Sequence, residues 1–171
     1  LCRDGKIARV GPMSSFTERL SDDVPELDAA GTVVLPGFVD SHTHMMFAGD
    51  RAGEFGMRVR GKSYQEIAEQ GGGILSTIRH VRAASKKELK RSTAAYLWAA
   101  MKEGTTTVEI KTGYGLDMDT EVRMLEAIHE LREEEMATVV PTFLGAHAIP
   151  PEFRDDAQGY VRLVIEKMIP Y

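Results

Sequence analysis

Two histidines separated by one residue, His42 and His44, have the spacing that most directly suggests chemistry in this sequence. They follow the apolar residues 37–39, which we expect to form a strand. Residues i and i+2 of a strand point to the same side, so both imidazoles would converge while Thr43 points away. Such a pair suits two ligands of one divalent metal, but the spacing alone fits a pair of structural histidines as well.

Polar residues also follow two later runs that resemble strands. Tyr114 lies between two glycines after residues 105–110, and His147 follows residues 137–143. If these runs are strands of one parallel barrel, their ends meet at the rim where such barrels keep their active sites. We therefore expect Tyr114 and His147 to approach the histidine pair. A structural role is the alternative for each, packing in a loop for Tyr114 and capping of a turn for His147.

The elements that would position these residues alternate between strand and helix. Capping boxes at Ser63 and Ser85, each with a glutamate three residues later, predict the starts of two helices. Apolar residues at helical spacing continue the second of these helices and predict two later ones: Leu89, Thr93, Leu97, Ala100 and Met101; Val122, Leu125, Ile128 and Leu131; Tyr160, Val161, Val164, Ile165 and Met168. The β-branched residues 105–110 and 137–143 predict strands between them.

This alternation predicts an α/β fold with a parallel sheet, most simply the first part of a (β/α)8 barrel of the TIM type. A doubly wound open sheet is the alternative. Upstream, Asp4-Gly5 predicts a tight hairpin turn. Residues 32–35 and 37–40 are apolar runs split by Pro36-Gly37, which suggests a strand that leaves one sheet and enters another. Because the chain opens at Leu1 and stops where a further strand is expected, we interpret it as a fragment.

Composition limits the kinds of partner. The 171 residues are 43% hydrophobic and 27% charged, as in an ordinary globular protein. The net charge of -5, with both signs mixed along the chain, disfavours nucleic-acid binding and leaves small molecules as the expected partners. We see neither a membrane-spanning apolar run nor a secretory leader, and we therefore expect a cytoplasmic protein.

Several motifs carry a resemblance to a known family. Residues 35–44, Leu-Pro-Gly-Phe-Val-Asp-Ser-His-Thr-His, resemble the signature of the amidohydrolase superfamily, and the opening hairpin resembles the start of its β-sandwich domain. Residues 47–51, 69–74, 109–117 and 142–150 are similar, in sequence and order, to the imidazolonepropionase family. The first motif is shared by many hydrolases and deaminases, whereas the last two are more particular. The resemblance implies part of a β-sandwich domain at residues 1–35 and the first portion of a metal-dependent hydrolase barrel at residues 36–171.

The resemblance also implies a role for individual residues. His42 and His44 become ligands of one zinc or iron ion, and Arg51, Tyr114 and His147 become substrate-binding residues, with His147 also taking part in catalysis. The guanidinium of Arg51 suits the carboxylate of a propionate group because it offers a planar fork of donors. The family takes its remaining metal ligands, a His and an Asp, and a Glu near the metal from later strands. We therefore expect this chain alone to be inactive.

The implied reaction is the hydrolysis of the cyclic amide of 4-imidazolone-5-propanoate to N-formimidoyl-L-glutamate in histidine degradation, by a metal-activated water, in a homodimer. One alternative is another amidohydrolase, such as a deaminase of a cyclic amidine, which would have no use for a carboxylate clamp at Arg51. Another is an inactive fragment that at most binds metal.

Lys111 resembles the carbamylated lysine of relatives with two metals, but we interpret it, like Asp40, as a supporting residue. His80 and His129, in charged helical stretches, are predicted to be solvated.

Overall fold

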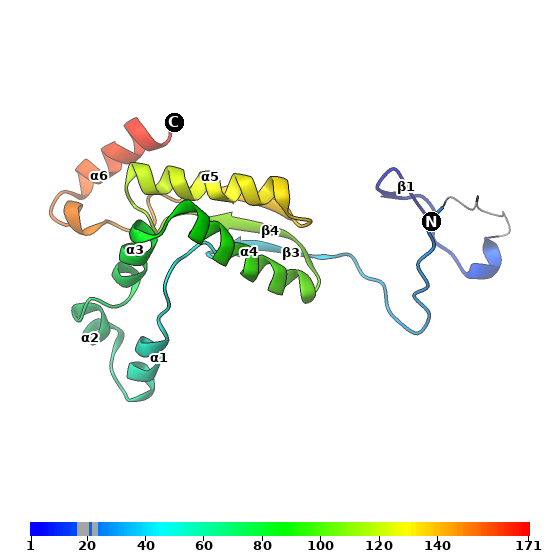
Figure 1. Cartoon of the computed structure of the whole chain (residues 1–171), viewed down its shortest axis with the longest axis horizontal. Helices are drawn as coiled ribbons and strands as arrows, with labels where there is room; N and C mark the ends of the chain where they lie inside the picture. The colour runs from blue at the N-terminus through cyan, green and yellow to red at the C-terminus, as the bar shows by residue number, and fades with distance from the viewer. Residues whose placement is uncertain (17–20, 22–23) are drawn as a thin grey trace. The chain divides into compact units, whose positions relative to one another are not determined.

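The described residues, 1–16, 21 and 24–171, divide into two units in this computed structural model, Leu1–Pro36 and Gly37–Tyr171. Residues 17–20 and 22–23 of the first predicted domain lie outside the described residues. Figure 1 shows the strands and helices of both units.

The first unit contains the predicted hairpin. Strands β1 (Cys2–Arg3) and β2 (Lys6–Ile7) pair antiparallel, and both turn residues, Asp4 and Gly5, have positive φ angles of 51° and 70°. Two positive φ angles are what a two-residue hairpin loop of the favoured twist requires, which explains the Asp-Gly pair. A short 3-10 helix, η1 (Met13–Ser15), follows.

The predicted strand at residues 32–35 is wrong. Val33, Val34 and Leu35 are 82%, 76% and 66% exposed and have no strand assignment. Their β-branched character favours an extended chain, but a strand also needs a hydrogen-bonded neighbour. Among the described residues, no strand pairs with this segment. Of the strand that was predicted to leave one sheet and enter another, only the second part forms, as β3, which begins at Phe38.

The second unit is built on a parallel sheet, as predicted. Strands β3 (Phe38–Thr43), β4 (Thr105–Lys111) and β5 (Thr138–Thr142) lie in the order β3-β4-β5, and both pairings are parallel. The carboxyl ends of the three strands therefore lie at one edge. This arrangement establishes a mixed α/β fold for this unit.

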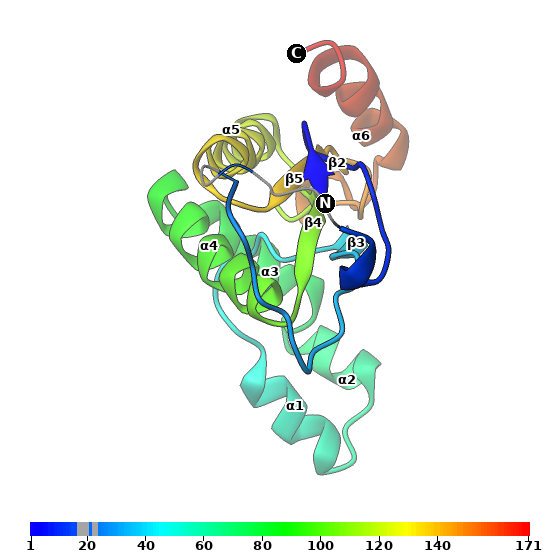
Figure 2. The same ribbon diagram turned by 90° about the vertical axis from the view of Figure 1, so that its right-hand side faces the viewer.

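Two long helices cover one face of the sheet. Helices α4 (Lys86–Lys102) and α5 (Met118–Glu134) lie side by side, α4 against β4 and α5 against β5 (Figures 1 and 2). The predicted capping boxes begin α2 (Tyr64–Glu69) at Ser63 and α4 at Ser85. The remaining helical elements are α1 (Ala52–Val59), α3 (Ile74–Ala83), η2 (Pro151–Phe153), α6 (Ala157–Leu163) and η3 (Val164–Met168). None of the described helices is long and apolar enough to span a bilayer.

The core lies between the sheet and these two helices. Val108, Ile110 and Val139 project from the strands into it, and Leu89, Leu97, Met124, Ile128 and Leu131 meet them from the helices. Each such side chain contributes about 1.5–3 kcal/mol through burial. On α5, Met124 and Ala127 are buried, whereas the predicted core residues Val122 and Leu125 are only half-buried.

A second, smaller apolar cluster holds the C-terminal helix. Tyr160, Val164 and Met168, at a spacing of four, are buried with Ile78 and Leu116. Val161 and Ile165, predicted on the same stripe, are 42% and 57% exposed. The last predicted helix is thus present, but it buries a narrower face than its apolar residues suggest.

Candidate metal and substrate site

Four side chains from the ends of three strands meet at the carboxyl edge of the sheet. The ring of His44 lies with its centroid 5.3 Å from that of His42, 4.8 Å from that of His147 and 5.6 Å from that of Tyr114. The rings of Tyr114 and His147 are 5.3 Å apart. The structure therefore brings the histidine pair together with the polar residues that follow β4 and β5.

The two histidines at the end of β3, His42 within the strand and His44 directly after it, fit a metal ion by their chemistry. The Nδ1 atom of His44 is buried and has no hydrogen-bond partner. Burial lowers the pKa of His44, and the charges of His147, His42 and Lys111 lower it further, so the imidazole is held neutral. Neutral imidazole nitrogens are ligands suited to zinc and iron. Within the described residues, no cluster of three or more His, Cys, Asp and Glu could hold a metal.

The end of β3 is anchored to β4 beside these histidines. The backbone N–H of Thr43 donates to Oε2 of Glu109 at 3.2 Å, and its hydroxyl donates to the Glu109 carbonyl at 2.6 Å. The pairing of β3 with β4 shifts register between Asp40 and Thr43. A local irregularity of this kind re-aims the side chains of a strand near a site. Asp40 accepts a long hydrogen bond, 3.4 Å, from the backbone N–H of His42.

Lys111 forms an ion pair with Glu109 on the same strand, and both side chains are largely buried. Burial alone would raise the pKa of Glu109, but hydrogen bonds from Lys111, Thr142 and the Thr43 backbone outweigh it and lower that pKa. The ion pair engages the amine of Lys111, which a carbamylated bridge between two metals would need free. The geometry therefore favours a supporting role for Lys111 over a metal bridge.

A glycine lets the loop after β4 approach His147. Gly113 has a φ of 101°, and a Cβ atom there would lie 2.8 Å from the carbonyl oxygen of Leu144 and 2.9 Å from Cβ of His147. Nδ1 of His147 lies 2.9 Å from the carbonyl oxygen of Gly113. Because a carbonyl oxygen only accepts, Nδ1 donates this hydrogen bond, and in the tautomer with one ring proton Nε2 is left as an acceptor.

Arg51 lies on the wall of a cavity beside these rings. The cavity has a volume of about 370 Å³ and is lined by His44, Arg51 and Tyr114, together with Phe47, Ala48, Gly49, Asp50, Thr77, His80 and Tyr96. Burial raises the pKa of the Tyr114 hydroxyl, and the charge of Arg51 opposes that shift. The lining of the cavity thus combines the guanidinium of Arg51, the phenol of Tyr114 and the ring of His44, a candidate metal ligand.

Glu54 orients Arg51, and the sequence did not reveal this role. Nε of Arg51 donates to Oε2 of Glu54 at 2.8 Å, and Oε1 of Glu54 accepts the backbone N–H of Gly73 at 2.9 Å. The position of Glu54 three residues after Arg51, at the start of α1, was the available signal. His80 and His129 are exposed, as predicted, but His80 also lines the cavity.

Comparison with known proteins supports the resemblance. No family model matches the chain. The chain is 50% identical over 170 residues to the imidazolonepropionase of Symbiobacterium thermophilum and 51% identical over 168 residues to that of Shewanella woodyi. The match to that of Herpetosiphon aurantiacus is 49% over 166 residues. These matches cover 97–98% of this chain but only 38–41% of the relatives, so the chain spans about 40% of their length. The predicted likeness to imidazolonepropionases is confirmed over nearly the whole chain.

Proposed function

We propose that this chain belongs to a hydrolase that opens the ring of 4-imidazolone-5-propanoate and yields N-formimidoyl-L-glutamate, a step of histidine degradation. The observation that carries the proposal is the meeting of His42, His44, Tyr114 and His147 beside the cavity of Arg51. The identity of about 50% to proteins named imidazolonepropionase supports it.

Arg51, Tyr114 and His147 each have a part in binding this substrate. Arg51 forms a bidentate pair with the propionate carboxylate, and its bond to Glu54 presents the rest of the guanidinium to the cavity. Tyr114 packs against the flat ring and offers a hydroxyl. His147, with Nδ1 held by Gly113, keeps Nε2 as an acceptor for a ring N–H and as the group that moves a proton during ring opening.

His42 and His44 would hold one zinc or iron ion. When bound, the metal supplies a water whose pKa is lowered towards neutrality. Desolvation keeps His44 neutral and thus ready to ligate. We expect the other ligands to come from outside residues 1–171, as the resemblance implies.

The architecture that goes with this function is a (β/α)8 barrel with a small β-sandwich domain. Residues 36–171 would supply its first strands, and residues 1–35 would form part of the sandwich. The order β3-β4-β5, with one helix-covered face, is compatible with the start of such a barrel. We further propose a homodimer in the cytoplasm.

The carboxylate clamp provides the sharpest test. In the complete protein, Arg51→Met should retain the metal and lose about 2 kcal/mol of substrate stabilisation, roughly 30-fold in kcat/KM. This is the lower end for a deleted partner of a charge pair, because the Arg51 side chain is 46% exposed. Arg51→Lys should recover only part of the loss, because an ammonium cannot make two parallel hydrogen bonds.

The test uses two substrates, 4-imidazolone-5-propanoate and an analogue with an amidated carboxylate. Wild type should prefer the acid, and Arg51→Met should show little preference. Arg58→Met, which changes an exposed arginine of α1, is the matched control and should keep the wild-type preference. If Arg51→Met prefers the acid as strongly as wild type does, another cation binds the carboxylate. A deaminase of a neutral base would show no preference in any variant.

A further inference from the structure

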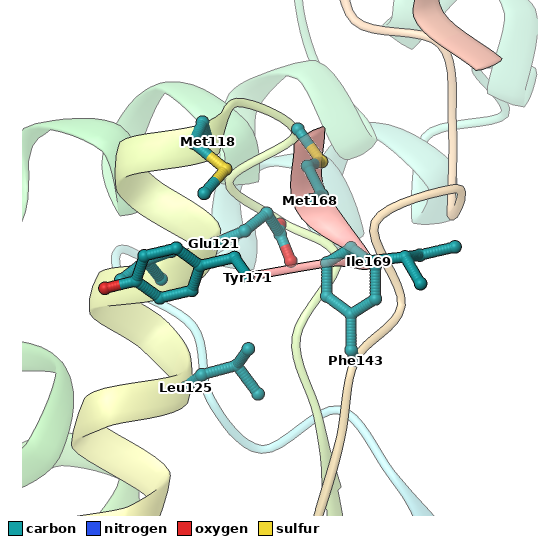
Figure 3. Close-up of a pocket in the computed structure, with 8 residues that line it drawn as sticks. Met118, Glu121, Leu125, Phe143, Met168, Ile169 and Tyr171 are labelled. Carbon is teal, nitrogen blue, oxygen red and sulfur yellow. The ribbon is translucent and has the colours of Figure 1, made fainter. Parts of the chain in front are cut away.

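Glu121 is a buried glutamate that the proposed reaction does not use. It lies in the first turn of α5 and is only 1% exposed. Figure 3 shows it reaching from α5 into an apolar surrounding that includes Met118, Phe143 and Met168. A carboxylate in such a place requires hydrogen-bond donors to offset its desolvation.

The donors are backbone N–H groups of the loop that carries Tyr114. Oε1 of Glu121 accepts from Gly115 at 2.8 Å and from Leu116 at 2.9 Å. The N–H of Gly113 lies 3.2 Å from Oε1 and 3.1 Å from Oε2. Three peptide groups of one short loop therefore point at a single carboxylate, in the manner of an anion-binding nest.

The loop needs this support because one of its residues has a sparsely populated backbone conformation. Leu116, a fully buried residue with a Cβ atom, has a φ of 56°. Such a conformation persists only where the surroundings fix it. On the other side of the loop, Nε of Arg82 donates to the carbonyl oxygen of Gly115 at 2.7 Å. Glu121 holds the loop by its N–H groups, and Arg82 holds it by a carbonyl.

We propose that Glu121 is a positioning residue for the substrate site, acting through Tyr114 and His147. Tyr114 lies between Gly113 and Gly115, both of which Glu121 binds, and the carbonyl of Gly113 accepts the Nδ1 proton of His147. One buried carboxylate thus sets the place of the tyrosine and the tautomer of the histidine. The inference deepens the proposed function and rests on it for the substrate.

The test is Glu121→Gln in the complete protein. The carboxamide keeps the shape, but its NH2 group would face backbone N–H donors. We expect KM for 4-imidazolone-5-propanoate to rise about tenfold, the effect of one lost hydrogen bond to a charged group. We expect kcat to fall as well, because His147 is the group that moves a proton in the proposed reaction, and we expect the metal content to stay the same. Glu133→Gln, on an exposed position of the same helix, is the control and should leave all three unchanged.

A second readout does not depend on the substrate. NMR spectra of protein labelled with 15N-histidine report which ring nitrogen carries the proton, and the His147→Gln variant assigns the signals of His147. Wild type should show His147 protonated at Nδ1. Glu121→Gln should lose this tautomer. Should Glu121→Gln fail to fold, Glu121→Asp, which keeps the charge but has a shorter reach, takes its place in both measurements. Unchanged His147 signals, or a KM that stays at the wild-type value, would overturn the proposal. If wild type does not open the ring, the proposed function fails, while the His147 signals still decide on Glu121.

Discussion

At the scale of single residues, His44 has a buried ring nitrogen that lacks a hydrogen-bond partner among the described residues. A buried polar atom left unpaired costs about 1–3 kcal/mol. A protein tolerates this cost where the atom serves a ligand, and His44 lies 5.3 Å, ring to ring, from a second histidine. The orphaned nitrogen is therefore a physical reason to regard the pair as a metal site.

We predict that His42→Ala and His44→Ala in the complete protein will each lower the metal content and abolish the proposed ring-opening activity. Each substitution removes one nitrogen ligand. Elemental analysis of the purified variants measures the metal, and His129→Ala, an exposed histidine on α5, is the control. Full occupancy in either variant would show that the pair is not the ligand set.

The sequence predicted the convergence of four site residues but not the residues that support them. His42 and His44 follow from the two-residue period of a strand, and Tyr114 and His147 follow from the shared edge of parallel strands. Glu121 could not be found in this way, and for Glu54 the three-residue spacing from Arg51 was the available signal. Both glutamates also accept hydrogen bonds from backbone N–H groups of loops, and no periodic sequence pattern predicts the path of a loop.

At the scale of elements, predictions were best where local signals were strong. The capping boxes of α2 and α4 fixed the starts of these helices because both partners lie within one turn. The buried face of α5 was predicted less well, since the apolar residues there extend beyond the face that meets the sheet. The strand expected at residues 32–35 does not form among the described residues, because a strand needs a hydrogen-bonded partner strand that the local sequence does not specify.

Helices α4 and α5 are also joined by charges. Lys86 contacts Glu126 and Glu130, and Lys90 contacts Glu130 and Glu134, at distances of 2.8–3.1 Å. Glu130 is shared by both lysines. Hydrogen bonds from Lys90 and Lys86 lower the pKa of Glu130 to about 2, against an ordinary value of 4.5.

This shift predicts a pH dependence of stability. Because the folded pKa is the lower one, the contribution of Glu130 is present above pH 4.5 and is lost as the pH falls towards about 2. The melting temperature of Glu130→Gln should therefore lie below that of wild type at pH 7, and the difference should shrink between pH 4.5 and 2. Because the ion pairs of Glu130 with Lys86 and Lys90 are partly exposed, 1 M salt should also shrink this difference in melting temperature. Glu133→Gln should show no such difference, and a gap that stays constant with pH would contradict the assignment.

At the scale of the whole second unit, the two strand pairings differ in how they are connected. The chain from β4 to β5 is a single compact crossover through α5, whereas the chain from β3 to β4 passes through α1, α2, α3 and α4. All residues of β3 except Thr43 are exposed, and its register with β4 is irregular. The β4–α5–β5 part therefore holds the larger share of the core.

This difference has a kinetic consequence for the chain of residues 1–171. Closing the longer loop costs more conformational entropy, so β3 should detach from β4 in partial openings that leave β4, α5 and β5 intact. The amides of β3 should then exchange with deuterium about threefold faster than those of β4 and β5, as peptide-resolved mass spectrometry would reveal. Because His42 and His44 lie at the end of β3, added zinc should slow exchange in β3 alone. Equal rates in all three strands would mean that the sheet opens only as a whole.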